Sequence, residues 1–236
     1  MNLQHSTLVF GPQTNSFDAA HLSTVRNSLI SNKRLKPFHK AVTELSDFLP
    51  TLLAHDSSLQ KLPAVEYCTF LTQWLETGAL PPGPMNRDLP NMVCTPLTVI
   101  IHVVQFFNYL ETHYEPVHAY DNLLASATPI GAQGFCTGFL TAAAVTCASD
   151  EDTLVKLCSN ALRLALCIGA YVDLDQSNAG ENWTTAIMVS WSERNKPVCD
   201  VYEFLKDFPE VSCFSSFAKP HLCRKILHVK FSVFIC

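Results

Sequence analysis

The sequence has 236 residues, of which 48% are hydrophobic and 16% charged, and its formal net charge is −5 at pH 7. This composition predicts a packed core and excludes wholesale disorder, and the acidic balance does not favour nucleic acid as a partner. The first residues lack a signal-peptide pattern, and the longest apolar stretch, residues 99–107, is too short to span a bilayer. We therefore expect a cytoplasmic protein without a membrane partner.

The first half of the chain is predicted to begin with a strand and to continue as helices. Residues 6–11, STLVFG, form a short apolar run that ends at a glycine, as buried strands do, and FGPQT follows as a turn. Apolar residues then recur at helical spacing over about 17–54 and over 65–78, where Gly78 should end the helix. A proline-rich loop precedes a helix over about 96–111, which is apolar on nearly every face and is expected to be buried.

The second half is predicted to hold a strand and two helices before the pattern changes. Residues 123–133 should contain a strand, although proline and glycine weaken it. Residues 139–148 form an apolar helix, and a longer helix follows over 149–174, with Ser149 or Asp150 as its N-cap. A loop is expected at 176–182.

Three segments are expected along the chain. Residues 1–181 should form a large α/β subdomain, and residues 182–211 an incomplete small subdomain with a β-α-β pattern. Residues 212–236 form a tail that is rich in cysteine and phenylalanine. We expect this tail to pack poorly, with Phe214, Phe217, Phe231 and Phe234 exposed.

The stretch GFCTG, residues 134–138, has the spacing of a nucleophile elbow with cysteine in the central place. On such an elbow Gly134 and Gly138 leave room for a tight strand-to-helix turn, and the helix N-terminus beside Cys136 stabilises a thiolate or an oxyanion. One oxyanion donor is the N–H of the next residue, here Thr137, and the other comes from an earlier loop. The alternative is that Cys136 is a small buried residue beside two convenient glycines.

The ten cysteines do not form a CxxC pair, so a zinc ribbon or a thioredoxin-type motif is not expected, and we predict no metal site. Most of them lie in apolar surroundings and should be reduced thiols that pack as small hydrophobic residues. His102 lies inside an apolar helix, where a core role is expected.

Four stretches in this order, FGPQT, PLTVIIHVVQF, GFCTGFLTAAAV and ALRLALCIGAYVD, resemble the starter-unit acyl carrier protein transacylase domain of fungal non-reducing polyketide synthases. The resemblance covers roughly residues 6–210. It implies an α/β fold of the acyltransferase type, with a mainly parallel sheet, flanking helices and the start of a ferredoxin-like small subdomain whose C-terminal part is missing. The family is a branch of the malonyl-CoA:ACP acyltransferase superfamily. In this branch cysteine replaces the serine nucleophile that is usual in the superfamily.

The resemblance also implies roles for single residues. Cys136 matches the acylated nucleophile, and Thr137 and Gln13 match the residues whose N–H groups bind the oxyanion. Phe135 stands where serine members often have a second histidine. The helix after the elbow lacks an arginine at the matching place, near Ala161, and Arg163 should be a surface charge. A non-carboxylated acyl group, acetyl to medium-chain, is therefore the expected substrate.

The catalytic histidine of the family is not matched in this sequence. Ala218 stands at the expected place in the only fragment that is similar, and His221 and His228 are the only downstream histidines. The chain therefore looks truncated after about residue 211. We expect Cys136 to be the most reactive of the ten thiols and to support little or no turnover.

The implied reaction is a transfer of an acyl group from a CoA thioester, or from a fatty acid synthase carrier protein, through Cys136 to the phosphopantetheine arm of a polyketide synthase carrier protein. No bound cofactor is expected. Two alternatives remain: a catalytically inactive remnant of such a domain, and a cysteine thioesterase.

Overall fold

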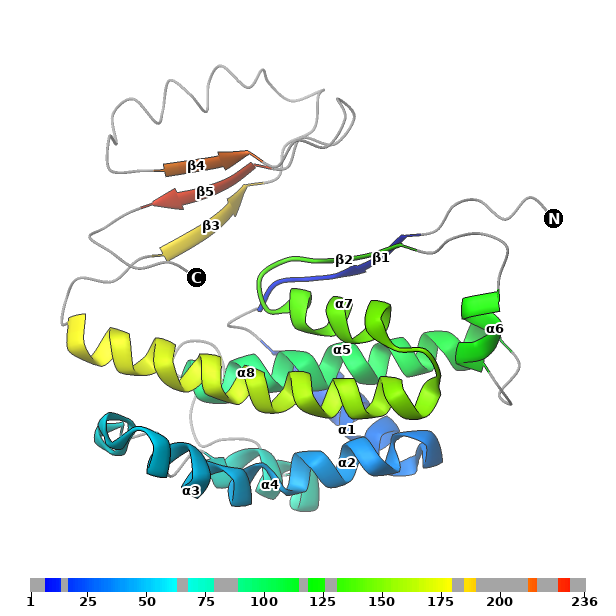
Figure 1. Cartoon of the computed structure of the whole chain (residues 1–236), viewed down its shortest axis with the longest axis horizontal. Coiled ribbons are helices and arrows are strands. Elements are labelled where there is room, and N and C mark those ends of the chain that lie inside the picture. The colour runs from blue at the N-terminus through cyan, green and yellow to red at the C-terminus, as the bar shows by residue number, and fades with distance from the viewer. Residues whose placement is uncertain are drawn as a thin grey trace. The chain divides into compact units, whose positions relative to one another are not determined.

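The computed structural model describes residues 7–13, 17–62, 68–78, 89–114, 119–125 and 131–179, and three short strands between residues 185 and 229 (Figure 1). The chain divides into two compact units, Met1–Leu174 and Asp175–Cys236, and each is described by itself. The first unit is mostly helical and contains a small parallel sheet, which is compatible with an α/β fold.

The sheet of the first unit consists of β1 (Thr7–Phe10) and β2 (Gly131–Gly134), which pair in parallel. The register runs from Thr7 opposite Gly131 to Phe10 opposite Gly134, so the two strands end side by side. Both strands were predicted. Each strand is four residues long, and within the described residues the parallel sheet consists of this pair.

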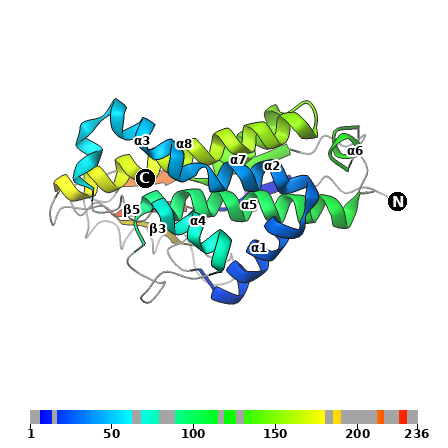
Figure 2. The ribbon, with the colours of Figure 1, turned by 90° about the horizontal axis from the view of Figure 1, so that it is seen from below.

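Helices form the remainder of the first unit. In Figure 1 the sheet lies over α7 and α5, and α1 to α4 lie on the opposite side; Figure 2 shows α5 running lengthwise beside α7 and α8. The helical elements are α1 (Ala19–Ser31), η1 (Lys33–Leu35), α2 (Lys36–Thr43), α3 (Leu45–His55), η2 (Ser57–Lys61), α4 (Cys68–Thr77), α5 (Asn91–His113), α6 (Ala119–Ala125), α7 (Gly138–Cys147) and α8 (Glu151–Ala179).

Helix α5 forms the centre of the core, as its apolar sequence predicted. Nearly all of its residues from Met92 to Leu110 are buried. Helices α5 and α8 are each long and apolar enough, by length and composition, to cross a membrane. However, 78% of the most apolar 18-residue stretch of α5 is buried inside the protein. A long apolar helix is also typical of a protein core, so the packing of α5 explains its length and composition.

Three predicted helix boundaries can be compared with the structure. Helix α4 ends at Thr77, and Gly78 follows with a φ of 73°, in agreement with the prediction. Asp150 caps α8 by accepting the N–H of Thr153 at 2.7 Å, also as predicted. The loop expected from residue 176 is wrong in its first residues, because α8 continues to Ala179. Between Gly169 and Gly180 the sequence contains no glycine or proline, so no helix-breaking residue stops α8 at residue 176.

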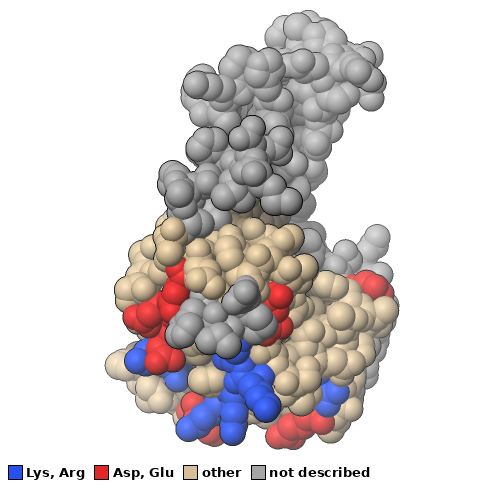
Figure 3. All heavy atoms as spheres, turned by 90° about the vertical axis from the view of Figure 1, so that its right-hand side faces the viewer, with Lys and Arg blue, Asp and Glu red and all other residues tan. Residues whose placement is uncertain are grey.

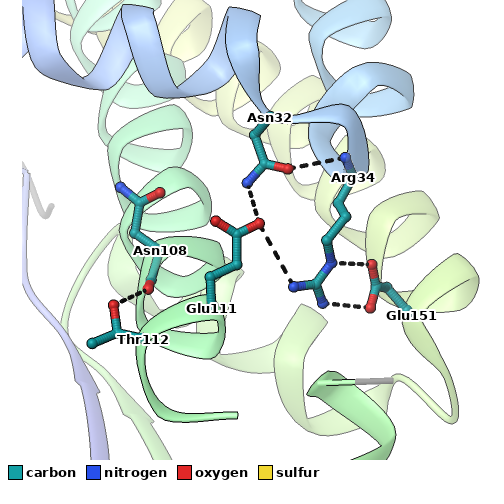
Figure 4. A network of polar contacts seen from close by, with 6 residues as sticks. All are labelled: Asn32, Arg34, Asn108, Glu111, Thr112 and Glu151. Atoms are coloured by element: carbon teal, nitrogen blue, oxygen red, sulfur yellow. Dashed lines mark hydrogen bonds and ion pairs between the residues drawn. The ribbon is translucent and has the colours of Figure 1, made fainter. Parts of the chain in front are cut away.

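A polar network joins three segments that are distant in the sequence (Figure 4). Arg34 of η1 binds both carboxylate oxygens of Glu151 at the start of α8, with Nε 2.6 Å from Oε1. Its guanidinium lies 5.2 Å from the ring centre of Phe107, and Asn32 donates to Glu111 of α5 at 2.8 Å. The hydrogen bond to Glu151 raises the pKa of Arg34. The network therefore fixes η1 against α5 and α8 at once.

Charged side chains of both signs lie next to one another on the face shown in Figure 3. Charges of opposite sign are also paired in the described residues: Nη1 of Arg34 is 3.8 Å from Oε1 of Glu111, and Nζ of Lys40 is 3.4 Å from Oε1 of Glu44. This face of the described residues therefore presents no extended field of a single sign.

The second unit contains β3 (Thr185–Val189), β4 (Ser212–Ser215) and β5 (Lys225–Val229). The strands form an antiparallel sheet in the order β3-β5-β4. The β-α-β pattern expected over residues 182–211 contains β3 near its start, and β4 follows this segment, at the start of the expected tail. The helix expected between them, and the expected exposure of Phe214, Phe217, Phe231 and Phe234, lie outside the described residues or side chains.

Candidate active site

Cys136 lies on a sharp turn between β2 and α7. Its φ is 53°, and among the described residues it is the only non-glycine residue with a positive φ. This left-handed conformation costs a residue with a side chain roughly 1–3 kcal/mol, and it persists only where the surroundings impose it. The side chain of Cys136 is exposed. A strained, exposed cysteine between a strand and a helix is the geometry of a nucleophile elbow.

Gly134 and Gly138 make this turn possible. A Cβ on Gly134 would lie closer than 3.0 Å to the backbone of Gly138 and Phe139, and one on Gly138 equally close to the carbonyl oxygens of Phe10 and Gly11. The turn is closed by Phe135, whose N–H donates to the Phe10 carbonyl at 3.0 Å. The two glycines therefore let α7 begin directly against the end of β1.

The two N–H groups that are expected to bind an oxyanion belong to Thr137 and Gln13. The N–H groups of Thr137 and Gln13 donate to no acceptor within the residues that the structure describes. Thr137 is buried and is the N-cap residue of α7. Gln13 follows β1 by three residues, and Cys136 follows β2 by two, so the parallel register brings both segments to the same edge of the sheet. We predict a separation below ~10 Å between the Cα atoms of Gln13 and Cys136, because both N–H donors must reach one oxyanion.

The side chain of Gln13 is held by two residues of α5 that the sequence analysis did not identify. Nε2 of Gln13 donates to Oδ1 of Asn91 at 3.0 Å, and the hydroxyl of Thr95 donates to Oε1 of Gln13 at 2.7 Å. Both residues precede the predicted start of α5 at residue 96. The sequence shows only a threonine beside an apolar helix. The folded chain shows that Thr95 is buried and that its hydroxyl holds Gln13.

His102 is a core residue, as predicted, with 9% of its surface exposed. Its ring stands edge-on to Phe10, with ring centres 5.7 Å apart. Burial lowers the pKa of His102 to about 4. Its Nδ1 has no hydrogen-bond partner among the described residues. The imidazole is therefore neutral at pH 7, just beneath the strand that leads to Gln13.

The remaining residues singled out in the sequence are Arg163, the downstream histidines and possible metal ligands. Nη2 of Arg163 is 4.0 Å from Glu44 at the junction of α2 and α3, and both side chains are about 41% exposed. Arg163 is thus a surface charge, as expected. His228 lies in β5 of the second unit, whereas Ala218 and His221 lie outside the described residues. No group of three or more His, Cys, Asp or Glu side chains that could hold a metal ion occurs in the described part of the chain.

The exposure of the cysteines leads to a first prediction. Cys136 and Cys147 are both exposed and lie at opposite ends of α7, whereas burial raises the pKa of Cys94 and of Cys158 to about 12 and raises that of Cys167. A thiolate is stabilised at a helix N-terminus and destabilised at its C-terminus, by about 0.3–1 kcal/mol at each end. Limited iodoacetamide treatment should therefore alkylate Cys136 several-fold faster than Cys147, and both well before the buried thiols. Peptide mapping by mass spectrometry measures this order, and faster labelling of Cys147 would contradict it.

The family model described as "Starter unit:ACP transacylase in aflatoxin biosynthesis" matches residues 8–198. The chain is 35% identical over 200 residues to 5-methylorsellinic acid synthase of Aspergillus terreus, which covers 83% of this chain and 7% of that protein. It is 38% identical over 172 residues to the non-reducing polyketide synthase pkbA of Emericella nidulans, covering 72% of this chain and 7% of that one.

A third relative is the non-reducing polyketide synthase esdpA of Penicillium shearii, 34% identical over 206 residues that cover 87% of this chain and 9% of that protein. The chain thus spans less than a tenth of the length of these three relatives. The family model covers all of β1 except Thr7, all of β2 and all of α1 to α8. On this evidence the chain belongs to the starter unit:ACP transacylase family of fungal non-reducing polyketide synthases.

Proposed function

We propose that this chain transfers a starter acyl group from a thioester donor to the acyl carrier protein of a polyketide synthase, with Cys136 as the nucleophile. The observation that supports this most directly is the left-handed, exposed Cys136 at the turn between β2 and α7. Strained backbone conformations of this kind cluster at functional sites, where they expose a reactive side chain. The family match supports acyl transfer as the reaction.

The proposed reaction has two thioester exchanges. The Cys136 thiolate attacks the carbonyl carbon of an acyl-CoA or acyl carrier protein thioester, and the N–H groups of Thr137 and Gln13 bind the oxyanion of the tetrahedral intermediate. Its collapse releases the donor thiolate and leaves an S-acyl bond on Cys136. The phosphopantetheine thiol of the acceptor then loses its proton to water or to the released donor thiolate and attacks the carbonyl carbon of this acyl group. The new thioester forms as the bond from Cys136 to the acyl group breaks, and Cys136 leaves as a thiolate. Because one thioester is exchanged for another, each step is nearly thermoneutral and needs no bound metal or redox cofactor.

The acyl group is proposed to be non-carboxylated, from acetyl to medium-chain. Recognition of a carboxylate needs a fixed cation, and a bidentate arginine is the usual one. The place that matches the family's carboxylate arginine is the buried Ala161, and Arg163 is directed to Glu44. We also propose that residues 182–211, which contain β3, are the start of a ferredoxin-like small subdomain, as the resemblance implies.

The test is formation of the acyl-enzyme. Incubation with hexanoyl-CoA should add one hexanoyl group to Cys136, detected by intact mass and by peptide mapping. Cys136→Ala should abolish the adduct, and Cys147→Ala, which removes the other exposed thiol of α7, should leave it. Malonyl-CoA should acylate Cys136 more slowly than hexanoyl-CoA.

The outcomes separate the alternatives. An adduct that passes to an added carrier protein supports the acyltransferase. Release of free hexanoic acid without a carrier protein indicates a thioesterase. No adduct on Cys136 would mean an inactive remnant of the domain. If transfer is rapid, a general base must be present, and His221 is the first residue to replace.

A further inference from the structure

A chain of hydrogen bonds connects α8 to the loop that contains Gln13. The carboxylate of Asp173 accepts the backbone N–H groups of Asn91 and Met92, both at 2.8 Å, and the side-chain Nδ2 of Asn91 at 2.9 Å. Oδ1 of Asn91 in turn accepts Nε2 of Gln13. The first turn of α5 is therefore the link between Asp173 and Gln13.

Asp173 supplies the N-cap that the sequence next to α5 lacks. The residue at the N-cap position is Pro90, which has no side-chain hydrogen bond to offer. The backbones of α8 and α5 touch at this point: a Cβ on Gly169, one turn before Asp173, would lie closer than 3.0 Å to the carbonyl of Asn91. Burial raises the pKa of Asp173, and the three donors act in the opposite direction. A carboxylate at a helix N-terminus is held there by these donors and by the helix dipole.

Gln13 is fixed at both ends of its amide group. Asn91 accepts from its nitrogen, and Thr95, one helical turn later on α5, donates to its oxygen. Pro12, just before it, restricts the backbone as well. With the side chain held at two points, the backbone N–H of Gln13 keeps a defined position relative to α5 and the end of β1.

We propose that Asp173, Asn91 and Thr95 are positioning residues that keep the backbone N–H of Gln13 in place to bind the oxyanion. The inference rests on the proposed function, in which Gln13 is one of two oxyanion donors. A donor lost outright costs on the order of 10²–10³ in rate, and a small displacement costs part of that. The three residues act through Gln13 and do not touch the reacting thioester.

Two threonines on α5 provide a matched test. Thr95 and Thr98 are both buried, but the hydroxyl of Thr98 donates to the carbonyl of Cys94 in its own helix. Thr95→Val should slow acylation of Cys136 by hexanoyl-CoA about tenfold relative to Thr98→Val, and Thr95→Ser should restore the rate. Alkylation of Cys136 by iodoacetamide forms no oxyanion, so its rate should be equal in all these variants.

A second measurement does not depend on catalysis. Amide hydrogen exchange of residues 11–13, followed by mass spectrometry, should be faster in Thr95→Val than in Thr98→Val, because the Gln13 side chain has lost one of its two anchors. Asp173→Asn, which places a donor against the N–H groups of α5, should accelerate exchange in the same segment.

The possible results are distinct. Equal acylation rates in Thr95→Val and Thr98→Val overturn the positioning role, and so does a parallel loss of acylation and alkylation in Thr95→Val. If the unmodified chain is not acylated by hexanoyl-CoA, the proposed function fails. Hydrogen exchange then decides whether the three residues hold the loop: unchanged exchange in Thr95→Val overturns the inference itself.

Discussion

Gly138→Ala should destabilise the protein by about 3 kcal/mol, at the upper end of the usual cost of overpacking. The new Cβ would meet the carbonyl oxygens of Phe10 and Gly11. These are backbone atoms of a hydrogen-bonded strand and its turn, so they cannot rotate away as a flexible side chain would. The start of α7 must move away from β1, and the hydrogen bond from Phe135 to Phe10 lengthens or breaks.

The same change should slow acylation of Cys136 on the order of 10²-fold, because a shift of about 1 Å is enough to misalign a nucleophile and its oxyanion donors. Gly131→Ala is the matched control, since a Cβ there has nothing within 4 Å and the residue begins β2, the strand that leads to the same turn. Urea unfolding and the acylation rate measure the two effects. Equal stability of the two alanine variants would show that the junction of β1 and α7 is not tight.

The stability of the protein should fall as the pH is lowered from 6.5 to 4, and His102 should account for about 3 kcal/mol of the loss. The folded-state pKa of His102 is about 4, against an ordinary value of 6.5, and burial is the cause. Between these two pH values the unfolded chain binds a proton at His102 and the folded chain does not. The unfolded state is therefore favoured as the pH falls, and the full stability is present above pH 6.5.

The contribution of His102 is isolated by a variant. His102→Leu should remove this part of the pH dependence, and it also removes a buried Nδ1 that has no partner among the described residues. His113→Gln, at the exposed C-terminal end of the same helix, is the control for the loss of one histidine from α5. Burial also lowers the pKa of His39, so the comparison uses the difference in stability between wild type and variant at each pH. Parallel loss of stability in wild type and His102→Leu would contradict the prediction.

The tight strand-to-helix turn at Cys136 could be predicted from the sequence because its determinants are local. The spacing of Gly134, Cys136 and Gly138 within five residues predicts a tight turn with an exposed side chain at its centre. The helices were predictable for a similar reason, since their apolar periodicity and caps, such as Asp150, lie within a few residues of each other.

The support of Gln13 could not be predicted in this way. Helix α5 begins at Asn91 because a carboxylate from Asp173, 82 residues away in the sequence, caps it. The local sequence instead suggested a start near Pro96, where proline commonly occupies the first turn. Side chains that meet only in the folded chain leave no pattern in either segment. For the same reason the sequence could not show that Asn91 and Thr95 hold Gln13.

The parallel pairing of β1 with β2 has a consequence for synthesis of the protein. Residues 7–10 leave the ribosome long before residues 131–134, their hydrogen-bonding partners, have been made. At about 5–20 residues per second, the wait lasts from several seconds to some tens of seconds. During it the apolar segment TLVF has unpaired backbone groups, which are a template for association with other chains. Molecular chaperones that bind short extended apolar segments would have a target here until β2 has been made.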